Sequence, residues 1–214
     1  MRKFFLLLMV ITFTGMTGCA SQRIERIDPA QVNETVRPDE AALVFYQSMG
    51  LHFTPKSFIP FVGPSLSQAM APIMETNEDG KLTPITYIIT GCKFFHKTTP
   101  GKHFYLLGGN PVEILEANLE AGKTYYVRIS QSSGLNIHFD FHPVTDPAND
   151  LPKEINSRIM YPPMKNTPAG EQRLLEDKAS LQAESLSALK RHNEENLGDK
   201  KIIRPEYGII APAQ

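Results

Sequence analysis

The chain has little net charge, no long apolar run and only two cysteines, and each of these features excludes a class of protein. Its 22 Lys and Arg nearly balance its 23 Asp and Glu, so the net charge of −1 gives no support for nucleic-acid binding. The apolar run from Phe4 to Phe13 is too short for a membrane-spanning helix, which needs roughly 20 residues. The sequence also lacks the "GxSxG" pattern of a serine-hydrolase elbow and any internal repeat.

The N-terminal segment, "MRKFFLLLMVITFTGMTGC", has the features of a secretory signal. Arg2 and Lys3 precede the apolar run, and small, turn-forming residues follow it up to Cys19. Its last letters, "MTGC", resemble the lipobox of bacterial lipoproteins, in which the cysteine is acylated and becomes the mature N-terminus. Met16 stands where that pattern usually has Leu. We therefore expect a lipoprotein signal peptide over residues 1–18 and lipidation at Cys19. An ordinary secretory signal cut near Gly18 is the alternative.

This resemblance implies a protein held on a membrane by its lipid. Acyl chains such as palmitate contribute about 0.8 kcal/mol for each buried CH₂ group, and two or more chains anchor stably. Ala20 stands where lipoproteins of the inner membrane usually have Asp, so the resemblance implies the outer membrane, with the body facing the periplasm. Loss of residues 1–18 removes two cations and no acid, which takes the net charge from −1 to −3.

Cys92 is then the one remaining thiol, so an internal disulfide is excluded. It lies in "ITGCKFF", among residues typical of strands, which favours a small buried side chain. The alternative is a catalytic thiol, which needs a cationic and partly exposed setting that Lys93 and His96 would have to supply.

Composition divides the rest of the chain into three parts. Residues 19–40 are polar with scattered Pro, which is typical of a tether between lipid and body. Residues 41–144 contain about eight short β-type runs with turns every 8–12 residues, which predicts an all-β fold, an antiparallel β-sandwich. Residues 145–214 are expected to form a loop, an amphipathic α-helix and a C-terminal tail.

Turn residues predict how the strands are joined. Ala41–Gln47 is rich in β-formers and opens the domain. Asp79-Gly80 predicts a hairpin. Pro100-Gly101 and Ala121-Gly122 each predict a turn at which two strands meet, with Gly101 and Gly122 supplying backbone conformations closed to other residues.

A helix is predicted over residues 167–198. Thr167 can act as its N-cap, Pro168 suits the first helical position, and Gly198 is expected to end it. Its narrow apolar stripe suits packing either on its own body or against another chain. The stripe consists of Leu175, Ala179, Ala183, Leu186 and Leu189.

Three segments together resemble a known family. They are "ALVFY", "TPGKHFYLLGG" and "LEANLEAGKTYYVRIS", the last leading into a strand with Gly, Phe and Pro. This combination resembles bacterial lipoproteins built around a small β-sandwich, catalogued as domain of unknown function 2846, over roughly residues 41–144. The resemblance implies an anchored envelope protein and no catalytic residue. The insert around residues 51–65 and the C-terminal helix depart from it.

The segment "HFDFH" is the sharpest chemical candidate. Alternate residues of a strand share a face, about 6.5–7 Å apart. One face then carries His138, Asp140 and His142, and the other carries Ile137, Phe139 and Phe141. Two imidazoles and a carboxylate suit Zn or Fe, and His96 or His103 can approach from a neighbouring strand. The alternatives are a solvated polar face and a pH-sensitive imidazole patch.

Two further sets of side chains are expected at the surface. Aromatic residues occur in adjacent pairs along the strands, so one of each pair faces outward. Tyr105 and Tyr125, or their neighbours, are expected to form a patch for a protein or glycan partner. Glu113 and Glu116 lie in a strand where they are expected to face solvent.

These observations favour a non-enzymatic binding or assembly module of the cell envelope. We expect it to use no cofactor and to have no nucleic acid among its partners. The alternative is a metal-dependent envelope hydrolase or a metal-binding protein that uses His138, Asp140 and His142. A purely structural role between envelope layers is a third hypothesis.

Overall fold

The computed structural model describes most of the body of the protein. The described residues are 23–28, 31, 33–47, 70–133, 137–153, 155, 161–196, 198 and 200–210. The expected signal peptide, the lipidation site Cys19 and the insert around residues 51–65 lie outside them.

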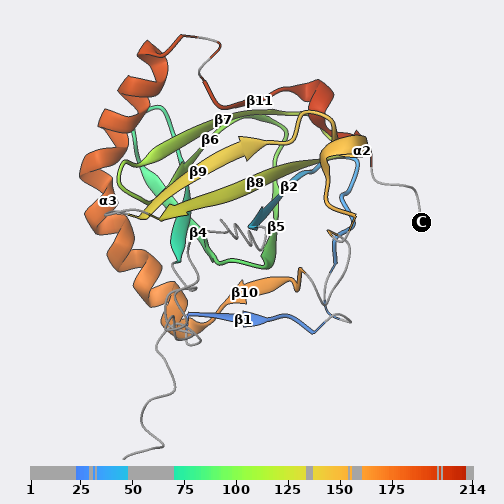
Figure 1. Ribbon diagram of the computed structural model, residues 1–214, viewed down its shortest axis with the longest axis horizontal. Coiled ribbons are helices and arrows are strands. Elements are labelled where there is room, and N and C mark those ends of the chain that lie inside the picture. Colours follow the sequence, from blue (N-terminus) through green and yellow to red (C-terminus); the bar gives the residue numbers. More distant parts are fainter. Residues whose placement is uncertain are drawn as a thin grey trace, which may run out of the picture.

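Two five-stranded sheets and a long C-terminal helix form this body, which confirms the prediction of a β-rich fold with a C-terminal helix (Figure 1). The first sheet contains β12 (Ile209–Ile210), β8 (Lys123–Ser133), β2 (Ala41–Gln47) and β5 (Cys92–Thr98) in that order, and β9 (Ile137–Pro143) also pairs with β8. The second sheet contains, in order, β11 (Ile202–Ile203), β7 (Glu113–Leu119), β6 (Gly101–Leu107), β3 (Ala71–Thr76) and β4 (Leu82–Ile88).

Smaller elements complete the described part of the chain. They are the ribbon of β1 (Ile24–Arg26) and β10 (Met164–Asn166), the helices α2 (Pro147–Asp150) and α3 (Pro168–Glu194), and the 3₁₀ helix η3 (Pro205–Tyr207). The described residues thus form twelve strands. Eight of these, β2 to β9, lie within residues 41–144, where about eight were expected, and the other four lie outside that range. Strands of two or three residues, such as β11 and β1, are too short to leave a periodic pattern in the sequence.

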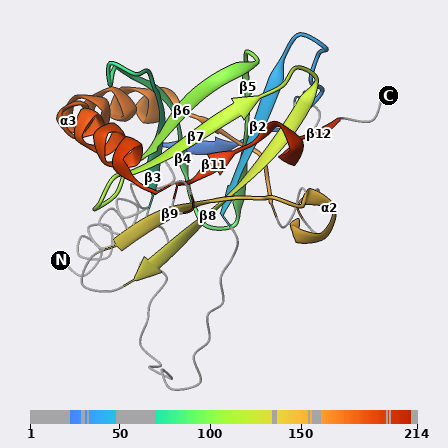
Figure 2. The same ribbon diagram turned by 90° about the horizontal axis from the view of Figure 1, so that it is seen from above.

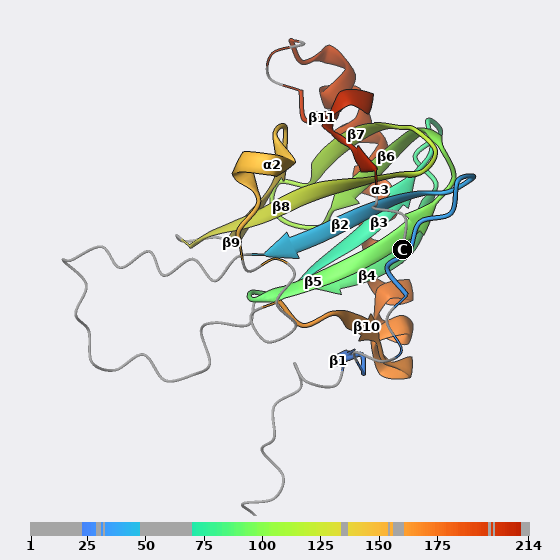
Figure 3. The same cartoon turned by 90° about the vertical axis from the view of Figure 1, so that its right-hand side faces the viewer.

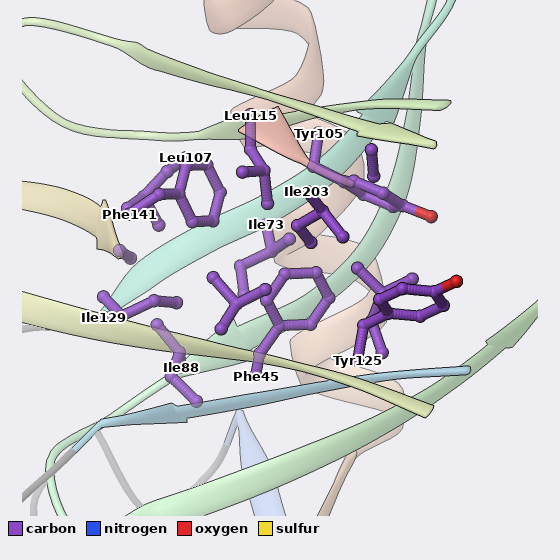
Figure 4. Packing of buried hydrophobic residues seen from close by; sticks show 14 of the residues in the cluster. Phe45, Ile73, Ile88, Tyr105, Leu107, Leu115, Tyr125, Ile129, Phe141 and Ile203 are labelled. Atoms are coloured by element: carbon purple, nitrogen blue, oxygen red, sulfur yellow. The ribbon is translucent and has the colours of Figure 1, made fainter. Parts of the chain in front are cut away.

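One hydrophobic core lies between the two sheets (Figure 4). The Phe45 ring of β2 is at its centre. It meets the ring of Tyr105 edge-on at 5.6 Å between centroids and the ring of Phe141 at 6.2 Å. All seven residues of β2 are buried, since this strand lies inside the first sheet and is covered on both faces.

Two of the predicted turns do not join paired strands. The hairpin of β3 and β4 around Gly80 is confirmed, but Pro100-Gly101 connects β5 of the first sheet to β6 of the second. Ala121-Gly122 likewise connects β7 of the second sheet to β8 of the first. Gly101 and Gly122 have φ values of 127° and 76°, which glycine adopts without strain. Turn chemistry marks a reversal of the chain and does not say whether the next strand stays in the same sheet.

The prediction of purely antiparallel sheets is wrong at β2. This strand pairs in parallel with β8, with Leu43 opposite Tyr125 and Phe45 opposite Val127. Four strands of the second sheet and β5 separate β2 from β8 in the sequence. Pairing over such a distance leaves no local signal, because a parallel pair needs a long connection.

Helix α3 packs on its own body, against the outer face of the second sheet and away from β8 and β9 (Figure 2). Its N-terminus is as predicted, since the Thr167 side chain accepts a hydrogen bond from the Gly170 N–H. The predicted C-terminus of the helix is wrong, because the helix stops at Glu194, before Gly198.

The predicted apolar stripe of α3 is wrong in part. Leu175 and Leu186 are each 54% exposed, while Leu174, Ser185 and His192 are buried. The buried face is partly polar, because the Ser185 hydroxyl donates to the carbonyl of Gly80 at 2.7 Å. The spacing of apolar residues therefore predicted a stripe that lies next to the buried one on the helix surface.

Part of the predicted tether is folded onto the body. Ile24 in β1 is buried, and β1 pairs antiparallel with β10. The Thr167 N–H donates to the carbonyl of Arg23 at 2.9 Å, which ties β1 to the start of α3. Further along the predicted tether, Glu34 forms a 2.8 Å ion pair with the buried ammonium of Lys93.

Candidate functional site

Strand β9 carries the histidines singled out in the sequence. It pairs antiparallel with β8, and Phe139 and Phe141 are buried in the core. The side chains of His138, Asp140 and His142 are half-buried on the opposite side. The predicted strand with one polar and one apolar face is confirmed for these five residues.

Four side chains from three parts of the chain meet at the start of β7. They are Glu113 of β7, His138 and Asp140 of β9, and Lys201, which directly precedes β11; we call them the β7–β9 cluster. One ligand atom each of Glu113, His138 and Asp140 lies within 4.8 Å of the other two. The Lys201 ammonium donates to Glu113 Oε2 at 2.6 Å and also pairs with Asp140 Oδ1.

The β7–β9 cluster sets two carboxylates against one ammonium. All four side chains are only a fifth to a third exposed, so solvent screens these charges incompletely. His138 Nε2 lies 3.9 Å from Glu113 Oε1, and its buried Nδ1 has no hydrogen-bond partner among the described residues. With a neutral imidazole the cluster keeps one net negative charge, which attracts a cation.

His142 is not part of this convergence, although the sequence grouped it with His138 and Asp140. Its Nε2 is 2.8 Å from the Ser130 hydroxyl and 3.8 Å from Asp140 Oδ2. Burial lowers the pKa of His142, and the Arg128 side chain, directly opposite across the strand pair, lowers it further. The side chains of alternate residues on one strand diverge, so the third member of the group around His138 and Asp140 comes from β7.

Glu113 is the residue that the sequence reasoning missed. It lies 25 positions before His138 and was expected to face solvent. It stands two residues before Leu115 and four before Ala117, both of which are fully buried in the inter-sheet core. A carboxylate at a core-facing position of a strand is unusual, and that position was the available signal.

Ser130, His142 and Asp140 do not have the geometry of a nucleophilic triad. In such a triad the serine binds one imidazole nitrogen and the carboxylate orients the other. Here the Ser130 hydroxyl and the nearest Asp140 oxygen both face Nε2. The carboxylate therefore does not fix the tautomer in which Nε2 accepts a proton from serine.

His96 and His103 do not approach β9 but form a separate polar group with Glu75 and Tyr105, the His103 group. His103 Nδ1 is 2.7 Å from Glu75 Oε1, and its Nε2 is 2.8 Å from the carbonyl of Thr99. The hydrogen bond raises the pKa of His103 and lowers the pKa of Glu75. Burial lowers the pKa of His96, whose ring meets Tyr105 edge-on at 6.0 Å.

The remaining sequence candidates have core positions. Cys92 is buried as predicted, and burial raises the pKa of its thiol to about 11, which is the opposite of an activated thiol. Tyr105 and Tyr125 are 0% and 1% exposed, so neither contributes to an outward aromatic patch. Both fill the core because their positions on β6 and β8 face the opposite sheet.

Among the described residues, no helix is long and apolar enough to cross a membrane. A comparison of the chain with protein-family models and with curated protein sequences finds no match.

Proposed function

We propose that the protein is an envelope lipoprotein, anchored through acylated Cys19 to the periplasmic face of the outer membrane, which acts as a non-enzymatic binding or assembly module. The observation that carries this proposal is the position of β1. The strand begins at Ile24, five residues after Cys19, and Ile24 is buried in the body. An extended chain spans at most about 3.6 Å per residue, so β1 is held within about 18 Å of the acylated cysteine.

This short link gives the body an orientation. β1, β10 and the N-terminal end of α3 lie at one end of the molecule, and β11 lies at the other (Figures 1 and 3). The 27 residues of α3 span about 40 Å. With the first end beside the lipid, the C-terminal end of α3 and the β7–β9 cluster are presented to the periplasm, where a partner can reach them.

A β-sandwich is the description of the body that the two facing sheets support best. It agrees with the resemblance to the lipoproteins of domain of unknown function 2846, which stays a prediction. The non-enzymatic role is supported by the two described candidates for a catalytic nucleophile, neither of which has the surroundings that catalysis would need. Cys92 is buried with a raised thiol pKa, and no carboxylate among the described residues orients the second nitrogen of His142 beside Ser130.

The anchor is tested by metabolic labelling with an alkyne palmitate analogue in a Gram-negative host, followed by membrane fractionation. We expect label and outer-membrane location in the wild type, loss of both in Cys19→Ser, and transfer to the inner membrane in Ala20→Asp. Absence of label from the wild type, or label that persists in Cys19→Ser, would refute the anchor.

The proposed binding or assembly role is tested by placing a photo-crosslinking residue at one end of the body or at the other. Glu195, just after α3, is exposed at the far end, and Lys165 in β10 is exposed at the near end. We expect discrete envelope-protein adducts from position 195 and none from position 165. Adducts from neither position, or equally from both, would contradict a module that presents its far end to a partner.

A further inference from the structure

We propose that Glu113, His138 and Asp140 form a binding site for a divalent transition-metal ion, and that the Lys201 ammonium competes with the ion for it. The proposal does not depend on the lipid anchor. It differs from the metal set that the sequence offered as an alternative, since Glu113 takes the place of His142.

The geometry brings a suitable set of donors together. The three ligand atoms lie at most 4.8 Å apart, and the ligands of a tetrahedral ion with bonds of about 2.0–2.2 Å lie roughly 3.4 Å apart. Side chains that are a fifth to a third exposed can close this difference by small rotations. Two carboxylates and one imidazole suit Zn²⁺, with a fourth position left for water.

Charge favours the ion over the ammonium. Lys201 supplies one positive charge to two carboxylates, whereas a divalent ion supplies two and neutralises both. The carboxylates already bind a cation at this point, because the Lys201 Nζ pairs with Glu113 and Asp140. An ion therefore needs no new arrangement of acidic groups, only the departure of the ammonium.

Lys201 has room to move aside while its backbone stays in place. Its carbonyl accepts a hydrogen bond from the Glu116 N–H at 3.0 Å, and the next two residues pair with β7. Its side chain borders two hollows, one of about 270 Å³ beside Arg191 and His192 and one of about 420 Å³ beside Arg204 and Tyr207. The first hollow is also lined by Glu195, whose carboxylate can accept the displaced ammonium, and both hollows admit an ion from solvent.

His138 limits the affinity that we expect. Its Nδ1 is buried without a hydrogen-bond partner among the described residues, so the ring lacks the acceptor that usually orients a metal-bound histidine. Such partners are commonly worth 10–100-fold in affinity. Together with competition from Lys201, this predicts an affinity for Zn²⁺ at least about tenfold lower than that of a site with an oriented histidine and no competing lysine.

The test is calorimetric titration of ZnCl₂ into the full chain, purified in detergent with a tag that contains no histidine. We expect one Zn²⁺ per wild-type chain, affinity at least tenfold higher in Lys201→Met, and affinity at least tenfold lower in His138→Ala. His142→Ala is the matched control, because it removes the next histidine on the same strand, and should stay within twofold of wild type.

Two results would overturn the proposal. One is the absence of stoichiometric binding in both the wild type and Lys201→Met. The other is a loss of affinity in His142→Ala as large as that in His138→Ala. If His138→Ala fails to fold, His138→Gln replaces it, and the rise in melting temperature caused by ZnCl₂ serves as a second readout. That rise should be larger in Lys201→Met than in wild type.

Discussion

The His103 group and the β7–β9 cluster are two histidine-containing polar sites at opposite ends of β6 and β7, and they are built differently. In the His103 group, both ring nitrogens of His103 have partners supplied by the body, at 2.7 and 2.8 Å. In the β7–β9 cluster, the compensating charge comes from one long side chain, that of Lys201.

The difference separates a fixed polar contact from an exchangeable one. A histidine held on both nitrogens has no free lone pair for a ligand and contributes to stability. A carboxylate pair held by a lysine can exchange that cation for another, because the ammonium is carried on a flexible stem. Histidine content alone therefore does not identify a site, and the origin of the counter-charge is more informative.

Phe45 connects the two sites, so its removal should have the largest effect. Its ring contacts Tyr105 of the His103 group and Phe141 of β9. We expect Phe45→Ala to lower the free energy of unfolding by about 3–5 kcal/mol, measured by urea denaturation. Phe95→Ala is the control, because Phe95 lies half-buried on β5 opposite Val44, on the outer face of the first sheet. A control loss equal to that of Phe45→Ala would contradict the shared core.

Glu75→Gln should have the next largest effect, because it leaves His103 without its charged partner. Hydrogen bonds to charged groups contribute about 1.5–3 kcal/mol, and the partial exposure of Glu75 reduces this. We expect a loss of about 1–2 kcal/mol by urea denaturation at pH 5.5. Glu78→Gln, at an exposed position in the adjacent turn, should change stability by less than about 0.5 kcal/mol.

The same variant gives a pH dependence with a defined sign. The raised pKa of His103 means that its contribution is complete below about pH 6.5 and is lost as the pH rises through the folded value. The lowered pKa of Glu75 means that its contribution is complete above about pH 4.5 and is lost as the pH falls through its folded value. The difference in unfolding free energy between wild type and Glu75→Gln should therefore be larger at pH 5.5 than at pH 8. An increase towards pH 8 would show that this pair does not titrate as described.

Local signals explain which parts of the fold could be predicted. The β-forming run of β2, the turn at Asp79-Gly80 and the cap at Thr167 each depend on neighbours within a few residues, and all three are confirmed. The parallel pairing of β2 with β8 and the sheet crossing at Gly122 depend on residues far apart in the chain. No spacing in the sequence encodes such contacts.

The same distinction holds for the candidate site. His138 and Asp140 were found because strand alternation places them on one face of β9. Glu113 and Lys201 lie 25 residues before and 63 residues after His138, and only the assembled sheets bring them to it. Leu175 on α3 shows how a local pattern can mislead. The helical spacing of apolar residues predicted that Leu175 is buried, but it is exposed, and the buried face of the helix contains the polar residues Ser185 and His192.

Lys201→Met should have the smallest effect on stability and the one that zinc changes most. Without metal we expect a loss of about 0.5–1 kcal/mol, because its ion pairs are partly exposed. At a free Zn²⁺ concentration 100 times the dissociation constant, binding adds about 2.7 kcal/mol, so the variant should then exceed wild type at the same concentration, where Lys201 still competes. Glu75→Gln should gain as much from Zn²⁺ as wild type does, since Glu75 is not among the three proposed ligands. If Zn²⁺ stabilised Lys201→Met no more than Glu75→Gln, the two sites would not differ in the way their counter-charges imply.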